Sequence, residues 1–236
     1  MKVLKILIDV LYPRRCPVCG AITPDGRDVC EKCVPSLVWI RQPICAKCGK
    51  ELVSETDEYC LDCTRRKKSF EYGRSLLNYN EAMAWSMGQI KYNNRREFLD
   101  FYAKEMAKRL GSVIARMDAQ ALVPVPVHAH RLKTRGFNQA KELADRLSPL
   151  LGLAVCDDLL VREKDTTPQK ELGPAQRLAN LQKAFRANEV PANLTGVILV
   201  DDIYTTGSTI EACTRALKVA GVKRVYFLAL CTGAGR

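Results

Sequence analysis

Apolar positions in the second half of the chain form short continuous runs that alternate with stretches of helical periodicity. Buried strands are indicated, in chain order, at 70–79, 121–125, 153–161, 197–200 and 222–230. Helices are indicated by apolar residues three and four positions apart at 95–117, 139–147 and 208–220. Strands that alternate with helices form parallel sheets with helices on both faces, because the crossovers are right-handed. The pattern therefore predicts an α/β domain that binds its ligand beyond the carboxyl ends of the strands.

The first residues of the chain show a different pattern. Leu4, Leu7 and Leu11 recur at helical spacing, and Lys5 and Asp9 interrupt the apolar run. No small-residue cleavage site follows, which argues against a signal peptide. We expect an amphipathic helix that ends at Pro13. Because no run approaches the ~18 apolar residues that a membrane span needs, a protein without a span and with a cytoplasmic location is expected.

Eight of the eleven cysteines lie in four evenly spaced CxxC pairs. The candidate metal ligands are Cys16, Cys19, Cys30, Cys33, Cys45, Cys48, Cys60 and Cys63. In a reducing compartment, paired thiolates favour metal binding over disulfides, and eight ligands complete two four-sulfur shells suited to structural zinc. Redox dithiols and iron–sulfur clusters are the alternatives. The spacing allows a sequential pairing of neighbouring CxxC pairs and a cross-braced pairing alike.

The cysteines and the charges divide the chain into two parts. Residues 1–69 are predicted to form a small zinc-binding domain, and residues 70–236 the α/β domain. The chain carries 37 basic and 26 acidic side chains. Zinc-bound thiolates would cancel the excess in the first part, so the positive charge belongs to the second part. We expect a basic surface beside its cleft that attracts polyanions such as single-stranded DNA, and the basic run at 65–68 is interpreted as a solvated linker.

One segment combines several features of a phosphate site. A buried strand ends in two carboxylates, and a loop of small hydroxyl residues with one glycine leads into a helix. Ser208 and Glu211 have the spacing of a capping box. Free backbone N–H groups at a helix start bind phosphate, and paired carboxylates accept hydrogen bonds from vicinal sugar hydroxyls, so the segment predicts a ribose 5-phosphate site. Its candidate residues are Asp201, Asp202, Thr205, Thr206, Gly207, Ser208 and Thr209. The simpler interpretation is that the carboxylates cap the loop or bind Mg²⁺.

These thirteen residues, 197–209, resemble the phosphoribosyltransferase fingerprint that binds 5-phosphoribosyl 1-diphosphate (PRPP). The stretches at 123–126, 135–139 and 162–185 resemble the ComF family of competence-related proteins. That resemblance covers nearly the whole chain. It implies a type I phosphoribosyltransferase-like parallel sheet with flanking helices, preceded by a small cysteine-rich zinc-binding domain.

The resemblance also implies roles for individual residues. Arg131 and Arg135 would lie at the diphosphate of PRPP, and Arg162 and Lys164 would belong to a flap, at 162–173, that closes over the ligand. An ordinary solvated loop is the alternative for the flap. Mg²⁺ would enter with PRPP, and a hood built from 70–91 would hold the acceptor. The function implied is a PRPP-dependent transferase with an unidentified acceptor, linked to DNA uptake.

A non-catalytic function remains open beside this one. The chain would then be a module that senses PRPP or a nucleotide, and its finger would bind protein or single-stranded DNA. Partners from the DNA-uptake machinery fit either function, and the sequence leaves the oligomeric state and the acceptor open.

Overall fold

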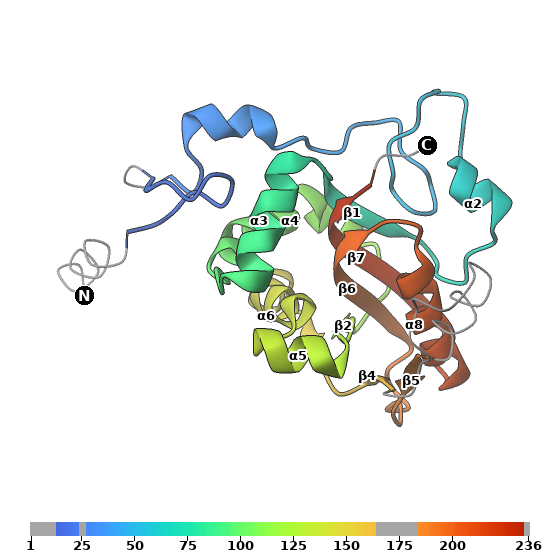
Figure 1. The fold of residues 1–236 in the computed structure, drawn as a ribbon. Helices are drawn as coiled ribbons and strands as arrows, with labels where there is room; N and C mark the ends of the chain where they lie inside the picture. The colour runs from blue at the N-terminus through green and yellow to red at the C-terminus, as the bar shows by residue number, and fades with distance from the viewer. Residues whose placement is uncertain (1–12, 24–26, 164–183, 234–236) are drawn as a thin grey trace, which may run out of the picture.

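The computed structural model describes residues 13–23, 27–163 and 184–233 of the chain, and a five-stranded parallel sheet lies at its centre (Figure 1). The order in the sheet is β1-β7-β6-β2-β3. The strands are β1 (Gly73–Asn78), β2 (Ala121–Pro124), β3 (Ala154–Val155), β6 (Gly196–Tyr204) and β7 (Arg224–Thr232). β4 (Leu160–Arg162) and β5 (Phe185–Ala187) form a separate antiparallel pair. The predicted α/β class and the parallel sheet are confirmed.

Helices cover both faces of the sheet, as the alternating pattern predicts. They are η1 (Glu31–Ser36), α2 (Leu61–Arg65), α3 (Glu81–Tyr92), α4 (Phe98–Ile114), α5 (Ala129–Arg135), α6 (Gln139–Leu151) and α8 (Ser208–Val219). α3, α4 and α6 pack on one face, where their apolar side chains form one core cluster with the sheet. α8 and the β4–β5 pair pack on the other face and form a second cluster.

β6 is longer than the apolar run predicts. It continues through Asp201 and Asp202 to Tyr204, because β7 remains paired with it to the end. Asp201 lies opposite Ala229, and Tyr204 lies opposite Thr232. The two carboxylates are therefore part of a rigid central strand, and the loop that leads to α8 begins only after Tyr204.

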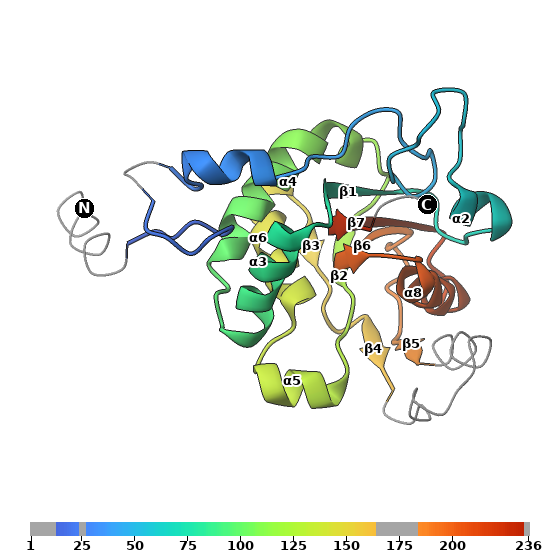
Figure 2. The same cartoon turned by 45° about the horizontal axis from the view of Figure 1, so that its top comes forward.

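The cysteine-rich segment crosses the edge of the sheet at β1. Figure 2 shows its first part beside α3 and α4 and its second part, with α2, beside α8. Between them the chain runs antiparallel to β1, where Asn78 N donates to Val38 O at 2.8 Å and Trp39 forms a bridge with Leu77. This connector covers an edge that would otherwise present unpaired backbone groups.

Two sequence predictions fall on residues outside the described ranges. The N-terminal amphipathic helix at 1–12 lies outside them, and so does the flap beyond Glu163, including Lys164. Among the described residues, no helix combines the length and the apolar character that crossing a membrane requires.

Candidate functional site: two zinc centres and a phosphate loop

The eight paired cysteines form two separate clusters, and the structure decides between the two pairings. Cys16, Cys19, Cys30 and Cys33 form one cluster, and Cys45, Cys48, Cys60 and Cys63 form the other. The pairing is therefore sequential, because each cluster is formed by one CxxC turn and the next CxxC turn along the chain. Within each cluster the candidate ligand atoms all lie within 4.8 Å of one another.

The spacing of the sulfur atoms fits zinc. Cys30 Sγ lies 3.2 Å from Cys33 Sγ, and Cys48 Sγ lies 3.6 Å from Cys60 Sγ. Sulfur atoms at a Zn–S distance of about 2.3 Å occupy the corners of a tetrahedron with edges of about 3.8 Å. Hydrogen bonds from neighbouring thiols lower the pKa of Cys45, although burial opposes this, so the cluster favours a thiolate. The chain has two zinc sites, each formed by four cysteines.

The acid pair at the end of β6 is buried, and its two members differ in charge. Asp201 is 9% and Asp202 8% exposed. Burial and the neighbouring charge of Asp202 raise the pKa of Asp201 well above its usual range. Burial acts to raise the pKa of Asp202, but the charge of Lys91 and hydrogen bonds with Asp201, Lys91 and Gln139 together outweigh it, and the pKa is lowered. Asp202 is therefore the member of the pair that ionises first, and Asp201 keeps its proton to higher pH.

Two residues at this acid pair were not predicted from the sequence. Lys91, at the end of α3, forms a salt bridge with Asp202 Oδ2. Gln139, at the start of α6, donates from Nε2 to Asp202 Oδ1 at 3.5 Å. Helices on the same face of the sheet bring both side chains to the end of β6. The predicted hood at 70–91 thus contributes at least one residue to the site, while most of its first part forms β1.

The loop after the acid pair, residues 205–209, is called the phosphate loop after its predicted role, and it makes a close turn at the start of α8. Gly207 adopts φ +75° and is the N-cap of α8, with no side chain capping the helix. Thr206 Oγ1 and Ser208 Oγ lie 2.8 Å apart. A Cβ atom at Gly207 would lie 2.4 Å from Tyr204 Oη, so only glycine fits this close turn. Ser208 N, the first N–H of this twelve-residue helix, donates to Thr206 Oγ1 at 3.4 Å, and among the described residues no side chain accepts from the N–H groups of Thr209 and Ile210.

The predicted capping box is wrong. Glu211 does not cap α8; it accepts hydrogen bonds from Ser69 N and Ser69 Oγ, both at 2.7 Å. It also forms a salt bridge with Arg215 at 2.7 Å. The spacing of a capping box is local information, and here a distant segment of the chain competes successfully for the carboxylate.

The interpretation of 65–68 as a solvated linker is wrong for its last member. Lys68 is 8% exposed, and its Nζ donates to Thr206 O, in the phosphate loop, at 3.0 Å. The three basic residues before it are exposed or nearly so. The segment that leaves the second zinc centre is therefore hydrogen-bonded to the phosphate loop.

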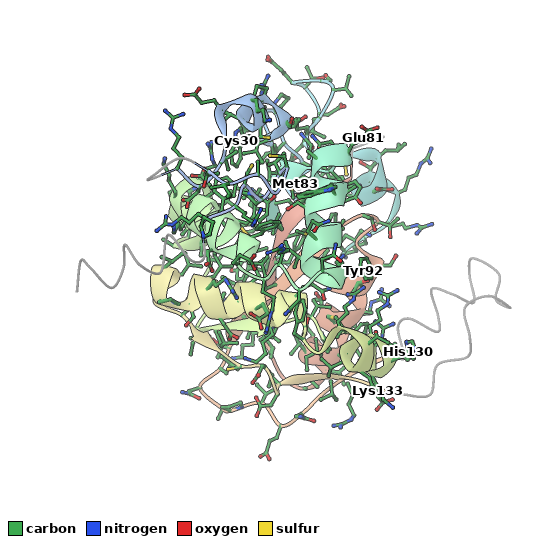
Figure 3. The ribbon with its side chains drawn as sticks, turned by 60° about the vertical axis from the view of Figure 1, so that its left-hand side comes forward. Cys30, Glu81, Met83, Tyr92, His130 and Lys133 are labelled. Carbon is green, nitrogen blue, oxygen red and sulfur yellow. The ribbon has the colours of Figure 1, made fainter. Side chains whose placement is uncertain are left out.

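Two arginines predicted to act on the diphosphate, Arg131 and Arg135, lie on α5, a helix that the apolar pattern does not predict. Arg135 donates to Gln139 Oε1 at 3.1 Å and lies 5.1 Å from the Tyr92 ring. In Figure 3, Tyr92 lies at the end of α3 near α5, whose His130 and Lys133 are labelled.

The arginine at the start of the predicted flap belongs to the same group. Arg162 is the last residue of β4, its Nε has no partner among the described residues, and its guanidinium lies 5.2 Å from the Phe185 ring. Burial lowers its pKa, and the charge of Arg131 adds to this effect. Close like charges are costly unless an anion lies between them.

Comparison with known proteins agrees with this architecture. Residues 7–64 match the double zinc ribbon domain, and residues 132–236 match the phosphoribosyl transferase domain. Competence protein F of Haemophilus influenzae is 30% identical over 83% of this chain and 85% of its own length. The chain belongs to the ComF family. Other relatives of this ComF chain are Competence protein ComFC of Bacillus subtilis, at 29% identity, and DNA utilization protein YhgH of Salmonella typhimurium, at 27%.

The relatives cover this ComF chain almost throughout. ComFC spans 85% of this chain and 81% of its own length, and YhgH spans 86% and 89%. The double zinc ribbon match contains all eight predicted ligands, and the transferase match contains the acid pair, the phosphate loop and Arg135. The resemblance stated from sequence motifs is confirmed at the level of the family and its two domain types.

Proposed function

We propose that this ComF chain binds PRPP at the carboxyl end of β6 and acts on it as a phosphoribosyltransferase. The single observation that carries the proposal is the acid pair followed by the open phosphate loop at the start of α8. The 5-phosphate would accept hydrogen bonds from the loop N–H groups, and the ribose hydroxyls would bond to the two carboxylates. The phosphoribosyl transferase domain match supports this ligand.

The charge state of the acid pair supports a role in holding a ribose. A protonated Asp201 can donate a hydrogen bond while Asp202 accepts one, so neighbouring hydroxyls would find a complementary pair. Lys91 keeps Asp202 ionised before the ligand enters. During transfer, positive charge develops on the ribose ring, and the buried carboxylate of Asp202 would stabilise it.

The leaving diphosphate would meet the arginines on the neighbouring elements. The charge of Arg131 contributes to the lowered pKa of Arg162, and Arg135 donates a hydrogen bond to Gln139, which in turn donates to Asp202. A polyanion between these guanidinium groups would relieve their mutual repulsion. Mg²⁺, which binds carboxylate and phosphate oxygens, would neutralise the diphosphate when it accompanies the ligand. Lys164 and the rest of the flap are proposed to cover the bound ligand.

The relatives support a role of this chain in DNA uptake. They include Competence protein F, Competence protein ComFC and DNA utilization protein YhgH. We place the protein in the cytoplasm, where PRPP is available. The bond between Lys68 and Thr206 favours a second function for the same site, in which bound PRPP changes the second zinc centre and the partner that it contacts.

The binding proposal can be tested with a matched pair of variants in the phosphate loop. Thr206 is exposed, so both Thr206→Asp and Thr206→Asn should fold. The aspartate places a negative charge beside the 5-phosphate. At about 4 Å and an effective dielectric constant near 20, that repulsion is ~4 kcal/mol, and we expect at least hundredfold weaker binding. The asparagine should weaken binding by less than tenfold.

Calorimetric titration of PRPP with Mg²⁺ measures both affinities. Equal affinities of the two variants, or no binding by the wild type, would contradict the proposed site. Turnover is measured separately, as pyrophosphate released from PRPP in the presence of a panel of bases, amines and DNA. Binding without release would favour the sensing function over transfer.

A further inference from the structure

A second pocket is lined by none of the residues of the phosphate loop, and all of its charged lining residues are basic. It is a cavity of about 460 Å³ between the connector of the two zinc ribbons, the start of β1 and the end of α4. Four arginines line it, namely Arg41, Arg74, Arg109 and Arg116. Among the described residues that line it there is no aspartate or glutamate. A concave site with four positive charges attracts anions.

The arginines of this pocket are only partly paired. Arg109 forms a salt bridge with Glu105 at 2.7 Å, and the Arg74 Nη1 donates to backbone oxygens of Gly73 and Ala46. Within the described ranges, no ion pair involves the side chains of Arg41 and Arg116. Arg74 and Arg116 both line the cavity; burial lowers the pKa of Arg74, and the charge of Arg116 acts in the same direction.

One buried polar group in the pocket lacks a partner. Ser75 is 3% exposed and lines the cavity, and its Oγ has no hydrogen-bond partner among the residues that the structure describes. A buried hydroxyl without a hydrogen bond costs about 1–3 kcal/mol. A ligand with an oxygen acceptor would supply the missing bond. This observation is independent of the charge, and it also indicates a bound group.

The wall of the pocket has an aromatic component. The Arg109 guanidinium lies 3.6 Å from the centre of the Trp39 ring system, so the two form a stacked pair. Flat cationic and aromatic surfaces of this kind are those on which nucleic-acid bases stack. The volume is within the range of small-ligand sites and suits one nucleotide rather than a duplex.

From this arrangement we infer that the pocket binds a nucleotide through its phosphate group, either free or as one unit of a single strand. The phosphate would lie between Arg41, Arg74 and Arg116 and would accept a hydrogen bond from the Ser75 hydroxyl. The base would contact the Trp39–Arg109 pair. The pocket lies near Arg116, at the end of α4 that precedes β2, whereas the acid pair lies at the carboxyl end of β6. Basic charge is expected beside the cleft, whereas these arginines line a separate pocket at the edge strand β1, where Ser75 is level with Asp201 and two strands away from it.

The test compares two double variants of equal net charge. Arg41→Gln with Arg116→Gln removes two charges from the pocket, and Arg186→Gln with Lys223→Gln removes two exposed charges elsewhere. Binding of a fluorescent 15-nucleotide oligothymidylate is measured by anisotropy over a range of salt concentrations. We expect at least tenfold weaker binding in the pocket variant and less than twofold in the control. The log–log salt slope should become shallower by about 0.7 for each phosphate that the variant no longer neutralises.

Further measurements identify the ligand and separate this site from the PRPP site. Titration with dTMP distinguishes a free nucleotide from a strand. If the wild type binds dTMP and the pocket variant binds it more weakly, the ligand is a free nucleotide. If the wild type binds the oligonucleotide but not dTMP, the ligand is a strand. Ser75→Ala should weaken binding severalfold without lowering the thermal stability. PRPP affinity should be unchanged in all these variants. Equal losses in the two double variants, or binding of neither probe by the wild type, would overturn the inference.

Discussion

The two zinc centres have the same ligands and the same local turns, yet they are integrated into the fold very differently. The first packs against α3 and α4, and Cys19 in it is exposed. The second is part of the core beneath α8, where Cys45 and Cys48 are fully buried. Lys50, beside this second cluster, lies 5.8 Å from the ring of Tyr204, which ends β6. Both centres contribute cysteines to the core, Cys16 and Cys33 on the face of α3 and α4 and Cys45, Cys48 and Cys60 on the face of α8, but only the first has an exposed ligand.

The second zinc centre is also the one connected to the phosphate loop. Lys47 O accepts from Gly73 N at 2.9 Å, which joins the ribbon to β1. Further along the chain, Lys68 donates a hydrogen bond to Thr206 O in the phosphate loop, and Ser69 donates one to Glu211 on α8. By contrast, the first centre lies near the start of α3, where Met83 belongs to the same core cluster. Figure 3 shows Cys30 close to this end of the helix and Tyr92 at the opposite end. We expect loss of the second centre to affect ligand binding and loss of the first to have a local effect.

The largest contrast is expected from removing one ligand in each centre. Cys48→Ser and Cys19→Ser change the second cysteine of corresponding CxxC turns. The folding free energy that a structural zinc contributes, apparent values of ~10–16 kcal/mol, is comparable to the whole stability of a domain. Cys48→Ser should therefore abolish the cooperative thermal transition or weaken PRPP binding at least hundredfold. Cys19→Ser should leave PRPP binding within threefold of the wild type.

Circular dichroism, zinc content and calorimetry measure these outcomes. Each folded variant should retain one zinc ion. Because Cys45 and Cys48 pack against the α/β domain, loss of the second centre should disturb that domain as well as the ribbon. Equal effects of the two substitutions on PRPP affinity would contradict the comparison.

The connection between the second centre and the loop can be cut without touching a zinc ligand. Lys68→Met removes the bond to Thr206 O, and Lys67→Met removes an exposed charge one position earlier. Hydrogen bonds from charged groups contribute about 1.5–3 kcal/mol. If the bond holds the loop in its binding geometry, PRPP affinity should fall about tenfold or more in Lys68→Met and remain unchanged in Lys67→Met. Both variants should retain two zinc ions, and an unchanged affinity in Lys68→Met would show that the loop is positioned without this bond.

The sequence predicts the elements that depend on local pattern and misses those that depend on distant contacts. CxxC spacing identifies all eight zinc ligands, and alternating strands and helices identify the sheet. Lys68 and Thr206 are 138 positions apart, and no local signal marks the lysine at the end of a basic run as buried. Lys91 is similar, because its role depends on α3 ending beside β6. Glu211 shows the converse: it has the spacing of a capping box, but its carboxylate accepts hydrogen bonds from Ser69, which is distant in the chain.

A smaller contrast is expected from the glycine that follows the first CxxC pair of each centre. Gly20 and Gly49 have φ values of +75° and +73°, so alanine at either position has the same backbone cost of about 1–2 kcal/mol. A Cβ atom at Gly49 would lie 2.8 Å from Gly73 O in β1, whereas one at Gly20 would meet only the far edge of Trp85 at 3.1 Å. Gly49→Ala should therefore lower the melting temperature by several degrees more than Gly20→Ala. Equal shifts in thermal unfolding would show that the two ribbons contact the domain equally.

The smallest effect is a pH dependence at the bond between Ser69 and α8. Burial acts to raise the pKa of Glu211, but hydrogen bonds from Ser69 and Arg215 outweigh it, and the pKa is lowered. A carboxylate with a lowered pKa stabilises the fold above its unfolded value of about 4.3, and this contribution is lost as the pH falls through the folded value. Glutamine keeps the acceptor but not the charge, so Glu211→Gln should be less stable by about 1–2 kcal/mol at pH 7. In urea unfolding at pH 3–7, the two free energies should converge toward pH 3. A difference that is constant over this range would mean that the charge of Glu211 does not hold the second ribbon to α8.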